Sequence, residues 1–159
     1  MKLFDKTDKE LITLYKNCDR LKNERKNALT LMKEIEKEWG KRLSDVRKGE
    51  YMFSIADEGM LSAFGYHVGD FGLNNNETRK YLLDIIVNCE YLPPIFCETR
   101  NYTFQWGKAK SSKRINKLLN VLGGLKYAHK NKASLKNAVK HWDCDYEFIT
   151  NKYKDLCKA

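Results

Sequence analysis

The first third of the chain carries a long apolar repeat that neither proline nor glycine interrupts before Gly40. Its residues recur at alternating steps of three and four, the spacing of a heptad repeat, and one of them is a charged arginine. They are Leu11, Leu14, Cys18, Leu21, Arg25, Ala28, Met32, Ile35 and Trp39. The repeat predicts one coiled-coil-like helix over residues 8–43, with Thr7 and Glu10 as a capping box at its start.

A helix over residues 8–43 is about 50 Å long, whereas a compact domain of this size has a radius of gyration of about 15 Å. It must therefore bend, project or lie along a partner. A second heptad pattern predicts a helix over residues 134–157, with Ser134 as its N-cap. Its members are Leu135, Val139, Trp142, Tyr146, Ile149, Tyr153 and Leu156. We expect the two helices to pair antiparallel within the chain; the alternative is a homodimer through residues 8–43.

Shorter elements are predicted between these two helices. A helix over residues 76–90 stops before Pro93 and Pro94, which cannot continue it. A helix over residues 112–130 contains Gly123 and Gly124, which indicates close packing against a neighbour or a break. The segments YMFSI (51–55) and YTFQW (102–106) alternate bulky residues with a period of two, as strands do. We expect a single, mainly α domain over residues 1–159, with a compact basic body over 50–159 and at most a small β-ribbon.

The net charge of +9 is distributed unevenly along the chain. Residues 1–50 carry 14 basic and 10 acidic side chains, residues 51–99 carry 2 and 7, and residues 100–159 carry 14 and 4. This distribution indicates a polyanion or an acidic protein surface as the partner of the last third. The alternative is a solvated lysine-rich surface.

Several classes of protein are disfavoured by the sequence. No apolar stretch approaches the roughly 20 residues of a membrane span, and the N-terminal segment MKLFDKTDKE is too polar for a signal peptide. The five cysteines show no disulfide-framework spacing, so we expect free thiols in a cytoplasmic protein. The abundance of lysine and asparagine suggests a bacterial or phage source.

Three glycines, Gly65, Gly69 and Gly72, precede the helix predicted from residue 76. Their spacing matches neither the dinucleotide-binding fingerprint nor the P-loop. We interpret them as a junction: Gly65 ends a short helix, Gly69 and Gly72 adopt positive φ, and one of the asparagines at 74–76 caps the next helix.

No catalytic motif is apparent, and we expect neither enzymatic activity nor a cofactor. His141 and Cys144 lie one helical turn apart, which is too few ligands for a zinc site. No third group orients a cysteine–histidine nucleophile. A loose acidic cluster lacks the spacing of a nuclease centre; it consists of Asp57, Glu58, Asp70 and Asp84.

The segment from residue 102 to 140 has the composition of a nucleic-acid interface. Aromatic residues precede lysines at a helix start, where backbone N–H groups favour phosphate, and Trp106 is a candidate for base stacking. The predicted binding residues are Trp106, Lys108, Lys110, Lys113, Arg114, Lys117, Lys126, Lys130, Lys132, Lys136 and Lys140. We expect them to form one continuous patch. The alternative places the aromatic side chains in the core and the lysines in solvent.

The segments GYHVG, LPP and WG, followed by a late tryptophan and tyrosine, span Gly65 to Tyr153. Their order resembles an uncharacterised helical module of bacterial proteins, some of them linked to DNA handling or defence. The resemblance implies a nucleic-acid context and no catalytic residues.

Two functional hypotheses follow from these patterns. The first is a non-enzymatic module that binds the phosphate backbone of DNA or RNA. The second is a small phage or host regulator that binds an acidic or nucleic-acid-binding protein surface through the N-terminal helix. Its predicted contact residues are Leu11, Leu14, Leu21, Met32, Ile35 and Trp39.

Overall fold

The computed structural model describes residues 1–56, 58–72, 75–96 and 103–157. The chain forms two compact units, one of residues 1–64 and 89–104 (unit 1) and one of residues 65–88 and 105–159 (unit 2). The described residues are mainly α-helical, as the sequence predicts, and their β-structure is one isolated bridge between Ala56 and Phe96.

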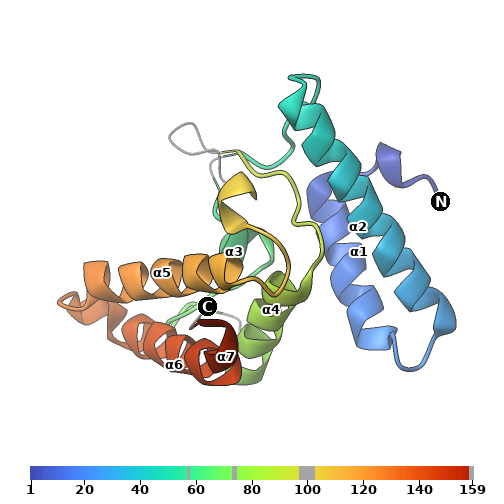
Figure 1. The fold of residues 1–159 in the computed structure, drawn as a ribbon. Helices are drawn as coiled ribbons and strands as arrows, with labels where there is room; N and C mark the ends of the chain where they lie inside the picture. The colour runs from blue at the N-terminus through green and yellow to red at the C-terminus, as the bar shows by residue number, and fades with distance from the viewer. Residues whose placement is uncertain (57, 73–74, 97–102, 158–159) are drawn as a thin grey trace. The chain divides into compact units, whose positions relative to one another are not determined.

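Unit 1 is built on a helical hairpin of α1 (Asp8–Leu21) and α2 (Lys26–Arg47), preceded by the 3₁₀ turn η1 (Leu3–Asp5) (Figure 1). The prediction of one continuous helix over residues 8–43 is therefore wrong. The chain turns at residues 22–25, where Glu24 and Arg25 both donate their backbone N–H to the carbonyl of Leu21. The turn lets the two halves of the apolar seam face each other, and it leaves the one charged member of the seam, Arg25, exposed. The predicted capping box is confirmed, with Thr7 and Glu10 bonded reciprocally.

Aromatic contacts hold the core of unit 1 together. Trp39 is fully buried, with ring centroids 5.5 Å from Tyr15 and 6.5 Å from Phe64. Gly40 lies so close to Tyr91 that a Cβ there would be 3.2 Å from the tyrosine ring. The short helix α3 (Met60–Ala63) contributes buried Met60 and Leu61.

A buried carboxylate also organises unit 1. Asp8 accepts hydrogen bonds from Arg42 at 2.9 Å, from Ser54 at 2.7 Å and from Tyr51. Burial and the Asp8 carboxylate raise the pKa of Tyr51 to about 12. The predicted strand over residues 51–55 is wrong: Tyr51 and Ser54 face one shared acceptor instead of alternating across a sheet.

The second predicted strand, over residues 102–106, is also wrong in its described part. Thr103–Trp106 form the 3₁₀ turn η2, and Tyr102 lies outside the described residues. Within unit 1, the Thr103 hydroxyl accepts from the backbone N–H of Ile95 at 2.7 Å and donates to the carbonyl of Pro93 at 2.9 Å. These bonds fold the segment against the proline turn.

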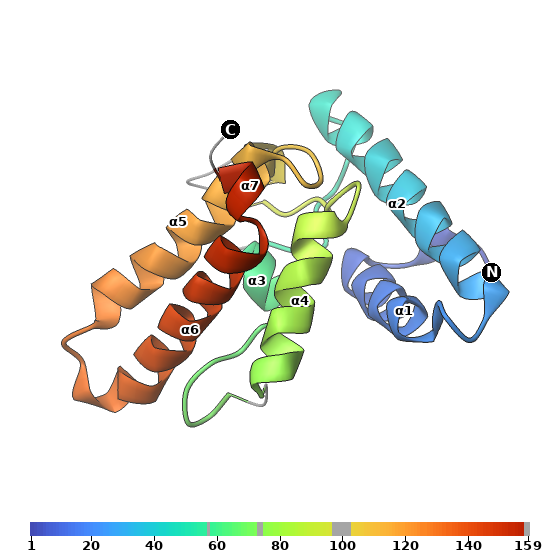
Figure 2. The same cartoon turned by 60° about the horizontal axis from the view of Figure 1, so that its bottom comes forward.

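Unit 2 packs α4 (Asn76–Asn88), α5 (Ser112–His129) and α6 (Lys136–Lys152), followed by the single turn α7 (Lys154–Cys157) (Figure 2). Helices α5 and α6 form an antiparallel hairpin joined by residues 130–135, which include the 3₁₀ turn η3 (Ala133–Leu135). The C-terminal helix is thus antiparallel as predicted, but its partner is α5, and α1 has its own partner in α2. Helix α5 runs unbroken through Gly123, where an added Cβ would lie 3.5 Å from the Tyr146 ring.

The glycine segment is a junction, as the sequence predicts. Gly65 and Gly69 have φ of 85° and 81°, and Asn75 caps α4 by accepting from the Thr78 N–H at 2.8 Å. Gly72 does not adopt the predicted positive φ. A larger residue is instead excluded from position 72 by lack of space, since a Cβ there would lie 2.7 Å from the Val68 carbonyl carbon.

One buried ion pair ties α6 to α4. Arg79 Nε donates to Asp145 at 2.7 Å, and the Tyr66 hydroxyl donates to the same carboxylate at 2.7 Å. All three side chains are buried. Burial and the neighbouring Asp145 charge raise the pKa of Tyr66. Tyr66 and Arg79 therefore fix the position of α6 relative to α4 and the glycine loop.

We predict that Asp145→Ala lowers the free energy of unfolding by about 3–5 kcal/mol, because it leaves a buried guanidinium without its carboxylate. The matched control is Asp143→Ala on the same helix. Asp143 is about half exposed and pairs with Lys126 at the surface, so its loss is expected to cost less than about 1 kcal/mol. Urea unfolding of both variants measures the difference. Equal free energies of unfolding for the two variants would contradict the structural role of Asp145.

Candidate nucleic-acid interface

The structure divides the predicted binding residues of unit 2 into two groups. One group lies at the start of α5 and contains Lys108, Lys110, Lys113 and Lys117. The other, here called the hairpin tip, spans residues 126–140 and contains Lys126, Lys130, Lys132, Lys136 and Lys140. At about 100° and 1.5 Å per residue, Lys113 and Lys126 lie about 20 Å apart along α5 and on different sides of it. The two groups are therefore separated along α5, and one continuous patch stays a prediction.

Two of the predicted binding residues belong to the core. Trp106 is 0% exposed, so it offers no ring face for a base to stack on. Arg114 is 2% exposed, and its guanidinium donates to the carbonyl oxygens of Ile86 at 3.3 Å and Gly107 at 2.7 Å. Arg114 therefore joins the start of α5 to α4, and neither side chain is available to a phosphate.

Two lysines at the start of α5, Lys113 and Lys117, have contacts within the unit, whereas Lys108 and Lys110 are exposed. The stem of Lys113 lies against Gly107, where an added Cβ would approach it to 3.0 Å. Lys117 donates to the side-chain oxygen of Gln105 at 3.0 Å. Ser111 caps the helix by accepting from the Arg114 N–H at 3.2 Å. This group therefore helps to close the turn that leads into α5.

The lysines of the hairpin tip, like Lys108, Lys110 and Lys113, lie largely at the surface. Lys130, Lys132, Lys136 and Lys140 are exposed, and within the described part of the chain none of them has an ion-pair partner. Lys126 is the exception: its bond to Asp143 raises its pKa. No acidic residue occurs in the sequence between Lys108 and His141. The tip therefore carries positive charge that the fold does not neutralise.

Tyr127 is an aromatic residue of the tip that the sequence analysis missed. Its side chain is 72% exposed, and the Lys130 ammonium lies 4.3 Å from its ring centroid. Tyr127 falls outside the apolar positions of the helix over residues 112–130, and this offset is the sequence signal that could have identified it. In the structure, Tyr127 is an aromatic side chain of the tip that is open to a ligand, as Trp106 is not.

The start of α6 is electrostatically unusual. Its N-cap is Leu135, not the predicted Ser134, and no side chain caps it. Its first turn contains no acidic residue and begins with Lys136, although the positive end of the helix dipole favours carboxylates there. Helix α1 shows the favourable arrangement, with a capping box and Asp8 and Glu10 in its first turn. An external anion would complement this end of the helix, beside the Asp70 carboxylate of the glycine loop, which accepts from Asn137.

His141 follows the tip and anchors the glycine loop. Its Nδ1 accepts the backbone N–H of Gly69 at 3.0 Å, so the neutral ring carries its proton on Nε2. Burial, and secondarily the charge of Arg79, lower the pKa of His141, while Asp145 and Asp70 act in the opposite direction. Protonation of His141 at Nδ1 would turn this acceptor into an N–H donor that faces the Gly69 N–H, and the hydrogen bond would be lost.

The structure also places the residues considered for catalysis. His141 binds Gly69, Asp70 accepts from Asn137, and Asp84 pairs with Lys152 and Tyr153. Glu58 pairs with Lys9 at 2.8 Å in unit 1, and Asp57 lies outside the described residues. Among the residues that the structure describes, no three His, Cys, Asp or Glu side chains are arranged to hold a metal ion.

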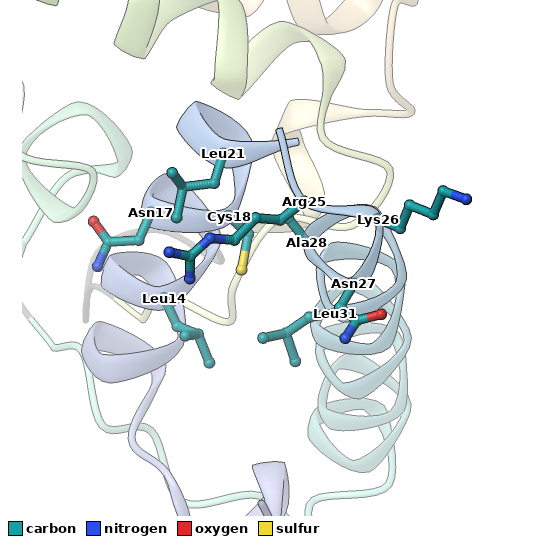
Figure 3. Close-up of a pocket in the computed structure, with 9 residues that line it drawn as sticks. All are labelled: Leu14, Asn17, Cys18, Leu21, Arg25, Lys26, Asn27, Ala28 and Leu31. Carbon is teal, nitrogen blue, oxygen red and sulfur yellow. The ribbon is translucent and has the colours of Figure 1, made fainter. Parts of the chain in front are cut away.

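Most of the predicted protein-contact residues form the core of unit 1. Leu11, Met32, Ile35 and Trp39 are buried. Leu14 and Leu21 are only partly buried and line a pocket of about 510 Å³ between α1 and α2 (Figure 3). The heptad pattern identified the apolar stripe correctly, but it did not distinguish the part that the fold buries from the part that it leaves open.

No protein-family model, curated protein or solved structure matches this chain. In the described part of the chain, no helix is long and apolar enough to cross a membrane. The function therefore has to be inferred from the charge and geometry of the two units.

We predict that the free energy of unfolding falls as the pH is lowered from about 7 to about 5, in part through His141. Because its pKa is lower in the folded protein than in the unfolded chain, its contribution is complete above the unfolded value of about 6.5 and is lost as the pH falls through the folded value. His141→Asn keeps an acceptor for the Gly69 N–H and does not titrate. Urea unfolding at several pH values should show a shallower pH dependence for this variant. An unchanged pH dependence would contradict the role of His141.

Proposed function

We propose that this protein is a non-enzymatic nucleic-acid-binding module that contacts the phosphate backbone of DNA or RNA through the hairpin tip of unit 2. The observation that carries the proposal is the set of four exposed lysines at the tip, Lys130, Lys132, Lys136 and Lys140, whose charge the fold does not neutralise. Lysine ammonium groups bind phosphates as point charges, without reading the base sequence.

The geometry of the tip supports this proposal. Lys132, Lys136 and Lys140 follow one another into the start of α6, where the helix dipole adds to their positive potential. Placing lysines there lowers the intrinsic stability of the helix, and such departures from local preference are expected at functional sites. A phosphate bound at the tip would offset the repulsion between these charges. The lysines at the start of α5 are the second candidate: Lys108 and Lys110 are exposed as well, but Lys113 and Lys117 make contacts within the unit.

The number of exposed lysines sets the expected salt dependence. If the four lysines each neutralise one phosphate of duplex DNA, the logarithm of the binding constant falls with the logarithm of salt concentration with a slope of about −3 to −4. Such a slope means a loss of affinity of about a hundredfold between 50 and 200 mM salt.

We predict that the triple variant Lys132→Glu, Lys136→Glu and Lys140→Glu binds nucleic acid much more weakly and loses about three units of the salt slope, one for each lysine. Glutamates at the start of α6 suit the helix dipole, so the variant is expected to stay folded. Fluorescence anisotropy of labelled single- and double-stranded DNA and RNA measures both quantities.

The matched control is Lys33→Glu, Lys41→Glu and Lys48→Glu, which makes the same change in net charge at exposed positions of unit 1. The control is expected to keep the slope of the unmodified protein. Equal losses in the two variants would show that net charge and not the hairpin tip governs binding, and would overturn the proposal.

We predict a separate role for Tyr127 with single strands. Stacking of a base on an aromatic side chain contributes about 1–3 kcal/mol, so Tyr127→Ala should weaken single-strand binding by roughly five- to a hundredfold and leave duplex binding nearly unchanged. Tyr127→Phe keeps the ring and should bind as the unmodified protein does. If the Ala and Phe variants show the same single-strand affinity in the anisotropy assay, Tyr127 does not stack on bases.

A further inference from the structure

The α1–α2 hairpin contains an apolar groove next to the turn at residues 22–25. Its floor is formed by Leu14, Cys18 and Leu21 of α1 and by Ala28 and Leu31 of α2, and its volume is about 510 Å³ (Figure 3). Leu14 and Leu31 project from the two helices into the space between them. All the residues that line it belong to unit 1. The groove is the part of the heptad seam that the hairpin leaves open.

The rim of the groove is basic. Arg25 extends from the turn across the space toward α1, whereas the side chain of Lys26, the first residue of α2, points away from that space (Figure 3). Asn17, on the α1 side, accepts a hydrogen bond from Arg20 at 2.9 Å, which holds a second guanidinium near the rim. Among the described residues, no acidic side chain lines this groove.

A second hollow of about 450 Å³ continues the groove along α1. The two share Leu14 and Asn17, and the second reaches Lys6 and Lys9. Lys9 is paired with Glu58, and the Glu10 carboxylate bonds to Thr7 in the capping box. Lys6 therefore contributes a positive charge to the second hollow. The distance from Lys9 to Leu21 is about 18 Å along α1, which corresponds to a partner helix of about twelve residues.

We propose that this groove binds an amphipathic helix of a partner protein that carries leucine-like residues on one face and Asp or Glu on its flanks. The apolar floor fits anchors spaced three and four residues apart, the helix-in-groove mode of recognition, and the basic rim complements acidic flanks. A second copy of this chain is a poor occupant, because it would bring the same basic rim against this one. The inference is independent of nucleic-acid binding, which uses unit 2.

Three synthetic helical peptides of about fourteen residues test this inference. They share leucines at positions i, i+3 and i+7 and differ only in their flanking residues, which are Glu, Gln or Lys. Titration into the full chain, followed by methyl NMR, reports both affinity and location. The Glu peptide is expected to shift the methyl signals of Leu14, Leu21 and Leu31 and to bind at least about tenfold more tightly than the Gln peptide. The Lys peptide is expected not to bind.

Variants of the groove test its basic rim and its apolar floor separately. Arg25→Glu should reverse the preference toward the Lys peptide, and Leu14→Gln with Leu31→Gln should remove binding of the Glu peptide. Leu29→Gln is the matched control, since Leu29 is a half-exposed leucine of α2 that does not line the groove. Binding that is indifferent to peptide charge, or that leaves the Leu14 and Leu31 methyl signals unmoved, would overturn the proposal. So would self-association of the chain that Leu14→Gln abolishes, because the occupant would then be a second copy.

Discussion

The position of helix α6 depends on one buried carboxylate. Asp145 accepts hydrogen bonds from Arg79 of α4 and from Tyr66 of the glycine loop, and all three side chains lie in the core of unit 2. A buried ion pair is not by itself a source of stability, but any displacement of α6 would leave an uncompensated charge in the core. The bond network therefore fixes the register of α6, and through it the place where the lysines at the tip emerge. Asp8 is the corresponding buried carboxylate of unit 1, where it accepts hydrogen bonds from Arg42, Tyr51 and Ser54.

The buried positive charges of this fold are arginines, whereas the exposed positive charges of the hairpin tip are lysines. Arg42, Arg79 and Arg114 are buried and bond to carboxylates or carbonyl oxygens. Lys132, Lys136 and Lys140 of the hairpin tip are exposed just before and within the first turns of α6, where they oppose the helix dipole. This division follows the chemistry of the two side chains, because the planar guanidinium suits fixed multidentate bonding and the lysine ammonium remains hydrated. It also explains why the binding surface that we propose consists of lysines.

Local patterns in the sequence predicted local structure well. The roles of Thr7, Gly65 and Gly69, and a cap from one of the asparagines at 74–76, follow from neighbouring residues alone. The structure confirms them, with Asn75 as the cap, because caps and turns depend on bonds within a few residues. The predicted apolar stripe of residues 11–39 is also largely buried. The turn at residues 22–25 was missed because the heptad spacing continues through it, and the choice between a straight helix and a hairpin depends on pairing between distant residues.

The candidate site was predicted less well, for a related reason. Trp106 and Arg114 belong to a basic, aromatic segment, yet their burial depends on Ile86 and other residues remote in sequence. Likewise, YMFSI has the alternation of a strand, but Tyr51 and Ser54 both bond to Asp8, more than 40 residues away in the chain. The basic character of residues 108–140 was visible in the sequence, whereas its division into two groups became visible only with the geometry of α5.

The most direct test of the proposed function is a map of backbone amide chemical-shift changes during titration of the unmodified protein with a short DNA duplex. The structure predicts changes concentrated in residues 126–140, with smaller changes at residues 108–117 and none in α1 and α2. Changes centred on residues 108–117 or on the α1–α2 groove, with the hairpin tip unaffected, would contradict the assignment of the tip as the binding surface.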